Sequence, residues 1–173
     1  SPTEPLPCPP GELMPPPEGA WGLDRSELAQ IPGYGADLEK RQEEARRLMR
    51  EAGYGPDKPL QLTLSTRDVQ RYRDTSVLIL DNLSKIYVKG EIKVYDTVLW
   101  TNVVLKKNYQ IGVRSRGQPV DDPDVSFYES FSCTSSRNAD GYCNKELEAL
   151  FDQQSATVDP VARKKLVKEI DRK

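Results

Sequence analysis

Residues 108–143, NYQIGVRSRGQPVDDPDVSFYESFSCTSSRNADGYC, decide how the rest of the chain is interpreted. The first part, residues 109–114, is mostly apolar and bounded by turn-forming residues, which is typical of a short strand in a covered sheet. Glycines, prolines and charged residues follow, so a regular strand cannot continue. The polar loop after the strand contains Arg114, Arg116, Gln118, Asp121, Asp122 and Asp124.

The place of this loop in the predicted sheet suggests a binding site. In an open α/β sheet, ligands bind beside the carboxyl ends of the strands, and the loop directly follows such an end. The same residues would equally suit a solvated turn held by salt bridges. The residues alone leave both interpretations open.

Two further strands are predicted upstream, at residues 60–65 and 91–96, with apolar residues alternating with polar ones. A helix over residues 72–87 separates them, and a short helix over 97–107 leads to the strand at 109–114. Parallel strands need crossover helices of this length, and such crossovers are almost always right-handed. The order predicts an α/β fold, namely a three-layer-like βαβαβ unit with additional C-terminal helices.

Further helices are predicted at residues 37–53, 125–131, 144–154 and 159–173. Asp37 and Asp159 are good N-cap residues, and Pro160 suits a first helical position. Residues 1–36 instead form a proline-rich extended arm, because their prolines exclude a helix or a sheet interior. We therefore predict two parts, an arm over 1–36 and an α/β lobe over 37–173. The last helix has no stop signal, which predicts a lobe truncated at the C-terminus.

Composition excludes several classes of partner. The chain has 173 residues, with 25 Lys and Arg against 27 Asp and Glu, and a formal net charge of −2. It lacks the basic surface that nucleic-acid binding requires. It also has no apolar run approaching the roughly 18 residues of a membrane helix. We expect no nucleic-acid partner and no direct membrane insertion.

Histidine is absent, which removes the commonest general base and the commonest metal ligand. Cys8, Cys133 and Cys143 lack the close spacing of zinc ligands, so we expect no metal and no cofactor. Cys133 and Cys143 flank a loop rich in Ser, Asn, Asp and Gly, which a disulfide could close. Such a bond would indicate an oxidising compartment. Two reduced cysteines are the alternative.

Two functions other than ligand binding are also compatible with parts of the sequence. Asp121, Asp122 and Asp124 lie close together, and glycosidases work with two carboxylates. However, neighbours in one loop seldom face each other across a substrate. The other alternative is a protein-interaction module whose proline-rich arm docks into a polyproline groove. The irregular spacing of the prolines weakens that alternative.

An ordered series of segments carries a family resemblance over residues 20–173. The segments are GYG, EARRLMREAGYGPDKPLQLTLSTRD, YDTVLW, YQIGV, DDPDVSFYESFSC, GYCNKELEALFDQQS and DPVARKKLVKEIDRK. They resemble the extracytoplasmic solute-binding proteins of family 5, the peptide, oligopeptide and nickel binding proteins of bacterial ABC importers. The resemblance implies that the chain is most of the large lobe of a two-lobed periplasmic binding protein, and not an enzyme.

The resemblance also implies partners and a location. Two lobes would close around a peptide or another small-molecule solute and deliver it to the membrane permease of an ABC transporter. The protein would be periplasmic, or extracytoplasmic and lipid-anchored in a Gram-positive bacterium. Paired cysteines of the dipeptide-binding members resemble Cys133 and Cys143, which supports the disulfide.

The resemblance further implies which residues contact the solute. In the family, an aromatic near the start of the helix matching residues 97–107 contacts the ligand, and Trp100 falls at that position. An aspartate that pairs with the α-amino group of peptides is replaced here by residues 118–120, and an aromatic before it by Arg116. Substitution by Asp121, slightly further along the loop, is one interpretation, and an anionic or polar, non-zwitterionic solute is equally compatible. Arg67 and Arg114 are predicted from the sheet order instead, because they lie at or just after the ends of predicted strands that meet at one edge. The expected ligand-binding residues are Trp100, Arg116, Arg114, Arg67, Gln118 and Asp121.

Overall fold

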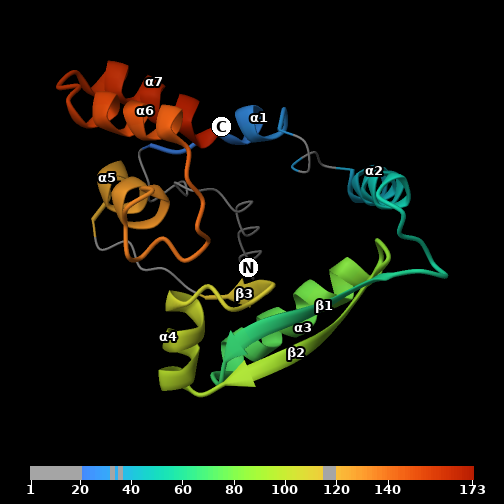
Figure 1. Cartoon of the computed structure of the whole chain (residues 1–173). Helices are drawn as coiled ribbons and strands as arrows, with labels where there is room; N and C mark the ends of the chain where they lie inside the picture. Colours follow the sequence, from blue (N-terminus) through green and yellow to red (C-terminus); the bar gives the residue numbers. More distant parts are fainter. Residues whose placement is uncertain (1–20, 32–33, 35–36, 115–119) are drawn as a thin grey trace, which may run out of the picture. The chain divides into compact units, whose positions relative to one another are not determined.

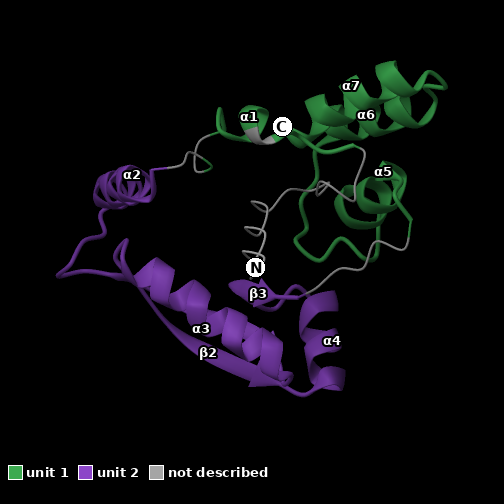
Figure 2. Ribbon diagram, turned by 180° about the vertical axis from the view of Figure 1, so that it is seen from behind, with its two compact units in different colours: residues 1–36, 118–173 green, residues 37–117 purple. Residues whose placement is uncertain are grey.

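The computed structural model describes residues 21–31, 34, 37–114 and 120–173 (Figure 1). The chain forms two compact units, shown in Figure 2. Residues 37–117 form one, here called the sheet unit, and residues 1–36 with 118–173 form the other, the helical unit. Within the described residues, no helix is both long and apolar enough to cross a membrane.

The sheet unit confirms the predicted βαβαβ order. It contains strands β1 (Leu60–Arg67), β2 (Val88–Tyr95) and β3 (Ile111–Val113), with helix α3 (Gln70–Ser84) after β1 and helix α4 (Thr97–Leu105) after β2. All pairings are parallel, in the order β2-β1-β3. Leu64 at the centre of β1 pairs with Ile92 on one side and Ile111 on the other.

The strand order creates a point where the chain reverses direction across the sheet. From central β1 the chain passes through α3 to β2 at one edge, and then through α4 to β3 at the opposite edge. The connection from β1 to β2 and the connection from β2 to β3 therefore run in opposite directions across the sheet. Such a switch point is where open α/β sheets bind ligands.

Helix α3 covers one face of the sheet, as Figures 1 and 2 both show. Tyr72 and Ser76 are buried on that side. Gly90 of β2 allows the close approach, because an added Cβ would lie 2.7 Å from Leu80 Cδ2. Apolar packing of this helix face thus fixes α3 on the sheet.

Several predicted boundaries were off by two or three residues. Strand β1 continues to Arg67 rather than residue 65. The hydrogen bonds to β2 extend as far as Asp68, whose backbone N–H donates to Tyr95 O at 2.7 Å. The helix predicted to reach residue 87 ends at Ser84, and Tyr87 has a positive φ of 66° that a helix cannot contain. Similarly, α4 ends before Lys107, whose φ is 54°.

Helix α2 (Leu38–Glu51) completes the sheet unit. Its N-cap is Asp37, as predicted, whose side chain accepts from Lys40 N. The left-handed conformation of Gly53, with φ of 86°, follows the end of the helix. Arg50 Nη1 donates to Tyr87 Oη at 3.0 Å, which ties α2 to the connection between α3 and β2.

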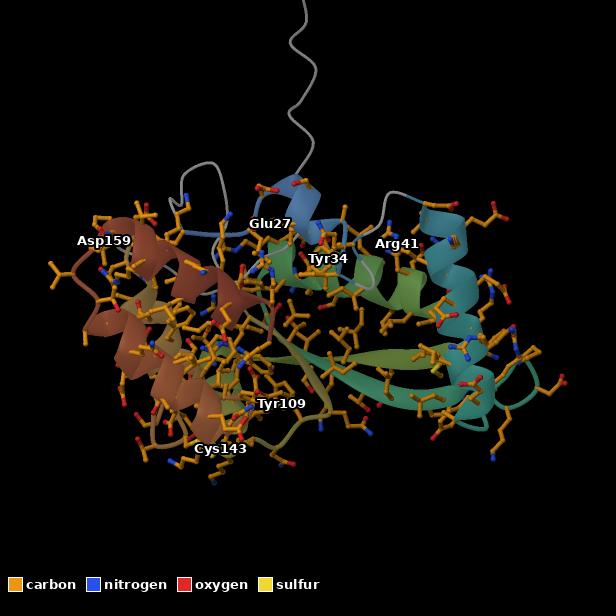
Figure 3. All side chains as sticks on the ribbon, turned by 90° about the horizontal axis from the view of Figure 1, so that it is seen from above. Glu27, Tyr34, Arg41, Tyr109, Cys143 and Asp159 are labelled. Carbon is orange, nitrogen blue, oxygen red and sulfur yellow. A yellow bond between two sulfur atoms is a disulfide. The ribbon has the colours of Figure 1, made fainter. Side chains whose placement is uncertain are left out.

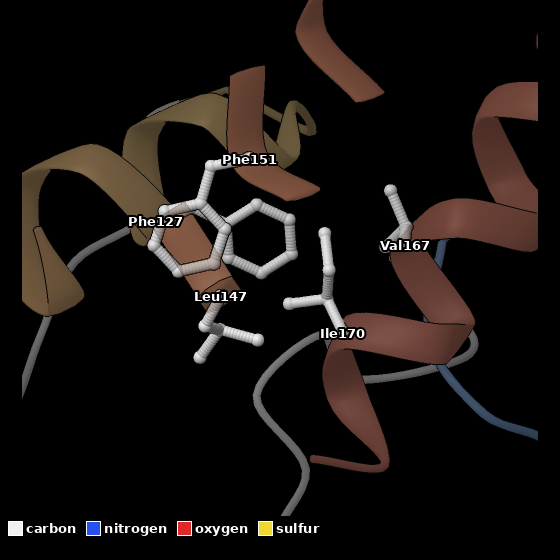
Figure 4. Close-up of a cluster of buried hydrophobic side chains, with 5 residues drawn as sticks. All are labelled: Phe127, Leu147, Phe151, Val167 and Ile170. Atoms are coloured by element: carbon white, nitrogen blue, oxygen red, sulfur yellow. The ribbon is translucent and has the colours of Figure 1, made fainter. Parts of the chain in front are cut away.

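The helical unit packs around one apolar cluster. Its elements are α1 (Arg25–Leu28), α5 (Pro123–Ser126), the π-helix η1 (Phe127–Phe131), α6 (Lys145–Ser155) and α7 (Pro160–Asp171). Figure 4 shows the cluster, which consists of Phe127, Leu147, Phe151, Val167 and Ile170. Phe127 and Phe151 stack at 4.8 Å between ring centroids. The predicted C-terminal helices are thus present, with Asp159 as N-cap of α7.

Part of the predicted arm is folded instead of extended. Helix α1, which periodicity did not reveal, begins after Asp24, whose side chain accepts from the backbone N–H groups of Ser26 and Glu27. Glu27 accepts hydrogen bonds from Lys168 and Arg172, at 2.5 and 2.6 Å, so α1 is fixed to α7. The proline-rich residues 1–20, with Cys8, lie outside the described residues. The domain division at residue 36 stays a prediction.

A disulfide joins Cys133 and Cys143, as predicted; Cys143 is labelled in Figure 3. The enclosed loop also has its own polar support. Buried Asn138 donates through Nδ2 to the carbonyls of Ser132 and Tyr142, and its Oδ1 accepts from Gly141 N. The disulfide and this amide therefore close the loop independently.

Removal of the disulfide should cost stability without unfolding the loop. Replacing Cys133 and Cys143 by alanine should lower the free energy of unfolding by about 2.5–3 kcal/mol, the chain-entropy value for a loop of this size. Urea denaturation measures the difference. As a check on the bond itself, mass spectrometry of a non-reduced digest should find the two peptides linked. Two alkylatable thiols at these positions in oxidised protein would contradict the assignment.

Candidate functional site

A cleft of about 360 Å³ lies at the carboxyl ends of the strands in the sheet unit. Arg67 ends β1, Arg114 follows β3, and Trp100 belongs to α4, which follows β2. The cleft is lined by Arg67, Arg71, Tyr72, Trp100, Thr101 and Arg114, together with aliphatic side chains of α4. Three of the six predicted ligand-binding residues, Arg67, Trp100 and Arg114, are thus brought together.

Helix α4 places Trp100 firmly in this wall. The carboxylate of Asp96 accepts from the backbone N–H groups of Val98 and Leu99 and so starts the helix directly after β2. Trp100 lies 6.2 Å from the rings of both Tyr95 and Tyr109, and only 6 % of it is exposed. Most of the indole therefore packs inside the sheet unit.

A glycine in β3 permits this packing. A Cβ added at Gly112 would lie 3.1 Å from the indole carbon Cη2 of Trp100 and 3.1 Å from the ring of Tyr109. A side chain here would require one of the two rings to shift by a few tenths of an ångström. The small residue thus fixes how closely the end of β3 approaches α4.

Two arginines in the cleft share one phenol. Arg67 Nη2 and Arg71 Nη2 donate to Tyr72 Oη, at 3.1 and 2.9 Å. Both guanidinium carbons also lie over the Tyr72 ring, 4.9 and 4.7 Å from its centroid. Cation–π attraction and hydrogen bonds hold both guanidinium groups beside the phenol. Residue patterns did not single out Arg71 or Tyr72, although Arg71 stands four positions after Arg67.

The end of β1 also contains polar atoms without a partner. Arg67 Nε and Thr66 Oγ1 are buried and form no hydrogen bond within the described part of the chain. Leaving such a group unsatisfied costs about 1–3 kcal/mol. Folded proteins keep such groups mainly where a ligand, ion or water can bind.

The remaining predicted site residues lie elsewhere. Arg116 and Gln118 are outside the described residues, so their roles stay predictions. Asp121 belongs to the helical unit, where its backbone carbonyl accepts from Trp21 Nε1 at 3.0 Å. Its proposed contact with a cationic group also stays a prediction.

The neighbouring aspartates hold the helical unit together. Asp122 accepts two hydrogen bonds from Arg163 of α7, at 2.9 and 3.2 Å. Asp124 accepts from Gln154 and from Ser155 of α6. These contacts assign Asp122 and Asp124 to the salt-bridged turn that the residues alone had left as one of two interpretations.

This pairing determines the protonation of Asp122. Burial would raise the pKa of the Asp122 carboxyl, but hydrogen bonds from Arg163 and from Asp124 N outweigh it and hold the pKa below its usual value. Asp122 is therefore ionised at neutral pH. It lacks the raised pKa of a catalytic general acid.

Stability of the helical unit should depend on pH through this carboxylate. Because its folded pKa is depressed, the contribution is present above the unfolded value of about 3.9 and is lost as pH falls through the folded pKa. Asp122→Asn should lower the free energy of unfolding by about 1 kcal/mol at pH 7. This value is smaller than for a buried ion pair, because the Asp122 side chain is partly exposed. Urea midpoints of both proteins should converge as pH falls below 4. A difference independent of pH would contradict this assignment.

A sequence profile of the family described as bacterial extracellular solute-binding proteins, family 5 Middle, matches residues 14–138. No curated protein sequence matches the chain. The described residues also contain no group of three or more Cys, Asp or Glu side chains placed to hold a metal ion.

Several solved structures share the fold. OppA from Burkholderia pseudomallei matches with a TM-score of 0.74 and 21 % identity, over 82 % of this chain and 28 % of that protein. The Escherichia coli murein tripeptide binding protein MppA matches with 0.73 and 19 %, over 81 % and 28 %. NikA from Staphylococcus aureus, in complex with Ni(L-His)2, matches with 0.67 and 22 %, over 76 % and 28 %. The chain thus spans less than a third of the length of these proteins.

Proposed function

This chain belongs to the bacterial extracellular solute-binding proteins of family 5, and we propose that it forms one wall of the solute site in a two-lobed binding protein. The intact protein would capture a peptide or a related small polar solute by closing its lobes around it. It would then deliver the solute to the membrane permease of an ABC importer, outside the cytoplasm. A lipid anchor is part of this proposal for a Gram-positive source.

The cleft at the carboxyl ends of the strands is the observation that carries the proposal. Arg67, Trp100 and Arg114 come from three different strand connections and line one cavity. A cavity at a switch point, with an apolar wall and a few convergent polar groups, has the properties of a small-molecule site. Two arginines at the ends of β1 and β3 offer fork-shaped donors suited to carboxylate or carbonyl oxygens.

Binding, rather than catalysis, is the chemistry this arrangement supports. The family consists of solute-binding proteins. Two of the three carboxylates that raised the possibility of glycoside hydrolysis, Asp122 and Asp124, are bound to Arg163, Gln154 and Ser155. Residues of the cleft supply hydrogen-bond donors and ring surfaces, which position a solute without reacting with it.

Substitutions in the intact two-lobed protein test the proposed wall. Trp100→Phe and Arg116→Ala should each weaken solute binding by at least about 1 kcal/mol, the usual threshold for an important contact. Phenylalanine is chosen at Trp100 because alanine would leave a cavity between Tyr95 and Tyr109. Calorimetry with the solute that co-purifies with the protein gives the affinities. Unchanged affinity in both variants, with folding intact, would place the site elsewhere.

A further inference from the structure

The loop between Cys133 and Cys143 contains the one Asp-Gly pair in the sequence, Asp140–Gly141. Such a pair is chemically labile, because the backbone nitrogen of the glycine can attack the carboxyl group of the preceding aspartate. Glycine has no Cβ to hinder this attack or to restrict the backbone rotation that it requires. Both residues are exposed, so water reaches the reacting atoms.

We propose that Asp140–Gly141 is a site of spontaneous succinimide and isoaspartate formation, and that the side chain of Asn138 restrains this reaction. The inference goes beyond the proposed function and is independent of it, because it requires neither a solute nor a second lobe. The substrate is the loop itself, and water is the only other reactant.

The reaction balances without an oxidant or a reductant. In the first step a bond forms between Gly141 N and Asp140 Cγ, a Cγ–O bond breaks, and one water molecule leaves with the amide proton. In the second step water adds to one of the two carbonyl carbons of the succinimide ring. If the Cγ–N bond then breaks, aspartate is restored. If the bond from nitrogen to the other carbonyl carbon breaks, isoaspartate forms, and the chain runs through Cβ and Cγ.

Asn138 holds the attacking nitrogen. Its Oδ1 accepts the hydrogen bond from Gly141 N at 2.9 Å. This hydrogen bond must break before the nitrogen can lose its proton and turn toward the Asp140 carboxyl, so it raises the barrier. The acceptor is itself fixed, because Asn138 is only 3 % exposed and its Nδ2 donates to Ser132 O and Tyr142 O, at 3.0 and 2.6 Å. The labile pair is thus open to water, but a buried side chain holds its nucleophile.

The product would alter the loop beyond the reacting pair. Isoaspartate at position 140 lengthens the backbone by one methylene group inside the loop that the disulfide closes. The longer backbone does not fit the spacing at which Asn138 contacts both Gly141 N and Tyr142 O. Tyr142 also lines an apolar pocket of about 330 Å³ in the helical unit, so the modification would displace part of that lining.

Incubation of the 173-residue chain in water enriched in oxygen-18 tests the proposal. Every succinimide that hydrolyses adds one heavy oxygen to residue 140, whichever bond breaks, and mass spectrometry of a digest locates it. A peptide of residues 134–142 gives the unrestrained rate. The folded chain should react at least about tenfold more slowly than the peptide, because local opening must precede the attack. Asn138→Ala should react at least about fivefold faster than the wild-type chain, because the hydrogen bond to the nitrogen is lost.

Two control variants separate this hydrogen bond from general loosening of the loop. Asp140→Glu should incorporate no heavy oxygen at this position, because the ring would need one more carbon atom and forms far more slowly. Replacing Cys133 and Cys143 by alanine opens the covalent loop but keeps Asn138, so the rate should stay close to that of the wild type. If the cysteine variant reacts as fast as Asn138→Ala, the assignment to Asn138 is wrong. A wild-type rate equal to that of the peptide, or no incorporation in Asn138→Ala while the peptide reacts, would overturn the proposal.

Discussion

The 173-residue chain alone should bind no peptide or related solute at micromolar concentration, whereas the intact two-lobed protein should bind its solute with a micromolar or lower Kd. The cleft of the sheet unit is open and supplies only one wall of contacts. Binding proteins of this kind obtain affinity by closing a second lobe over the solute. We expect a difference of at least about a hundredfold, which corresponds to roughly 2.7 kcal/mol. Calorimetry on both proteins with the co-purified solute measures it.

Micromolar affinity of the isolated chain for a peptide would show that the site is complete within these residues. The two-lobe account would then be wrong.

Phe127→Ala should lower the free energy of unfolding by about 3–5 kcal/mol, the cost of removing a large aromatic from a packed core. Phe127 is fully buried and stacks on Phe151, at 4.8 Å between centroids. The other buried members of this cluster are Leu147, Phe151, Val167 and Ile170, so Phe127 contributes a large part of its apolar surface. Urea denaturation followed by circular dichroism measures the loss.

Val161→Ala provides the control for this substitution. Val161 lies on α7, like the core residue Val167, but 79 % of it is exposed. Its replacement should change the free energy of unfolding by less than about 0.5 kcal/mol. If Phe127→Ala costs no more than Val161→Ala, the cluster does not stabilise the helical unit.

Most strands and helices could be predicted from the sequence because they have a local signal. Apolar alternation marks β1, and the carboxylates of Asp37 and Asp159 accept the N-cap hydrogen bonds that their positions predicted. Boundaries were less accurate where the local signal is missing. Tyr87 and Lys107 adopt positive φ although neither is a glycine. The residue types therefore did not indicate where α3 and α4 end.

The sequence predicted only those site residues whose position follows from the order of the strands along the chain. Arg67 and Arg114 follow directly from their positions at strand ends, and parallel topology brings such ends together. Arg71 and Tyr72 were missed because the helix was predicted to begin at residue 72, whereas its first turn starts at Gln70. The burial of Trp100 depends on two tyrosines and a glycine from other elements, and periodicity does not report such tertiary contacts.

The acidic loop shows why sequence alone left two interpretations open. Asp122 pairs with Arg163, which is 41 positions away, and Asp124 with residues about 30 positions away. No local pattern identifies a partner at such a separation. An unpaired cluster of carboxylates and a structural ion-pair network therefore have the same sequence signature.

A structure of the intact two-lobed protein with its co-purified solute would test most directly whether the cleft of the sheet unit is a wall of the solute site. The account predicts solute oxygens within about 3.2 Å of a guanidinium nitrogen of Arg67, Arg71 or Arg114, a normal hydrogen-bond distance. It also predicts that the solute lies over the carboxyl ends of β1 and β3. A solute bound between the lobes without contact to any residue of this cleft would contradict the account.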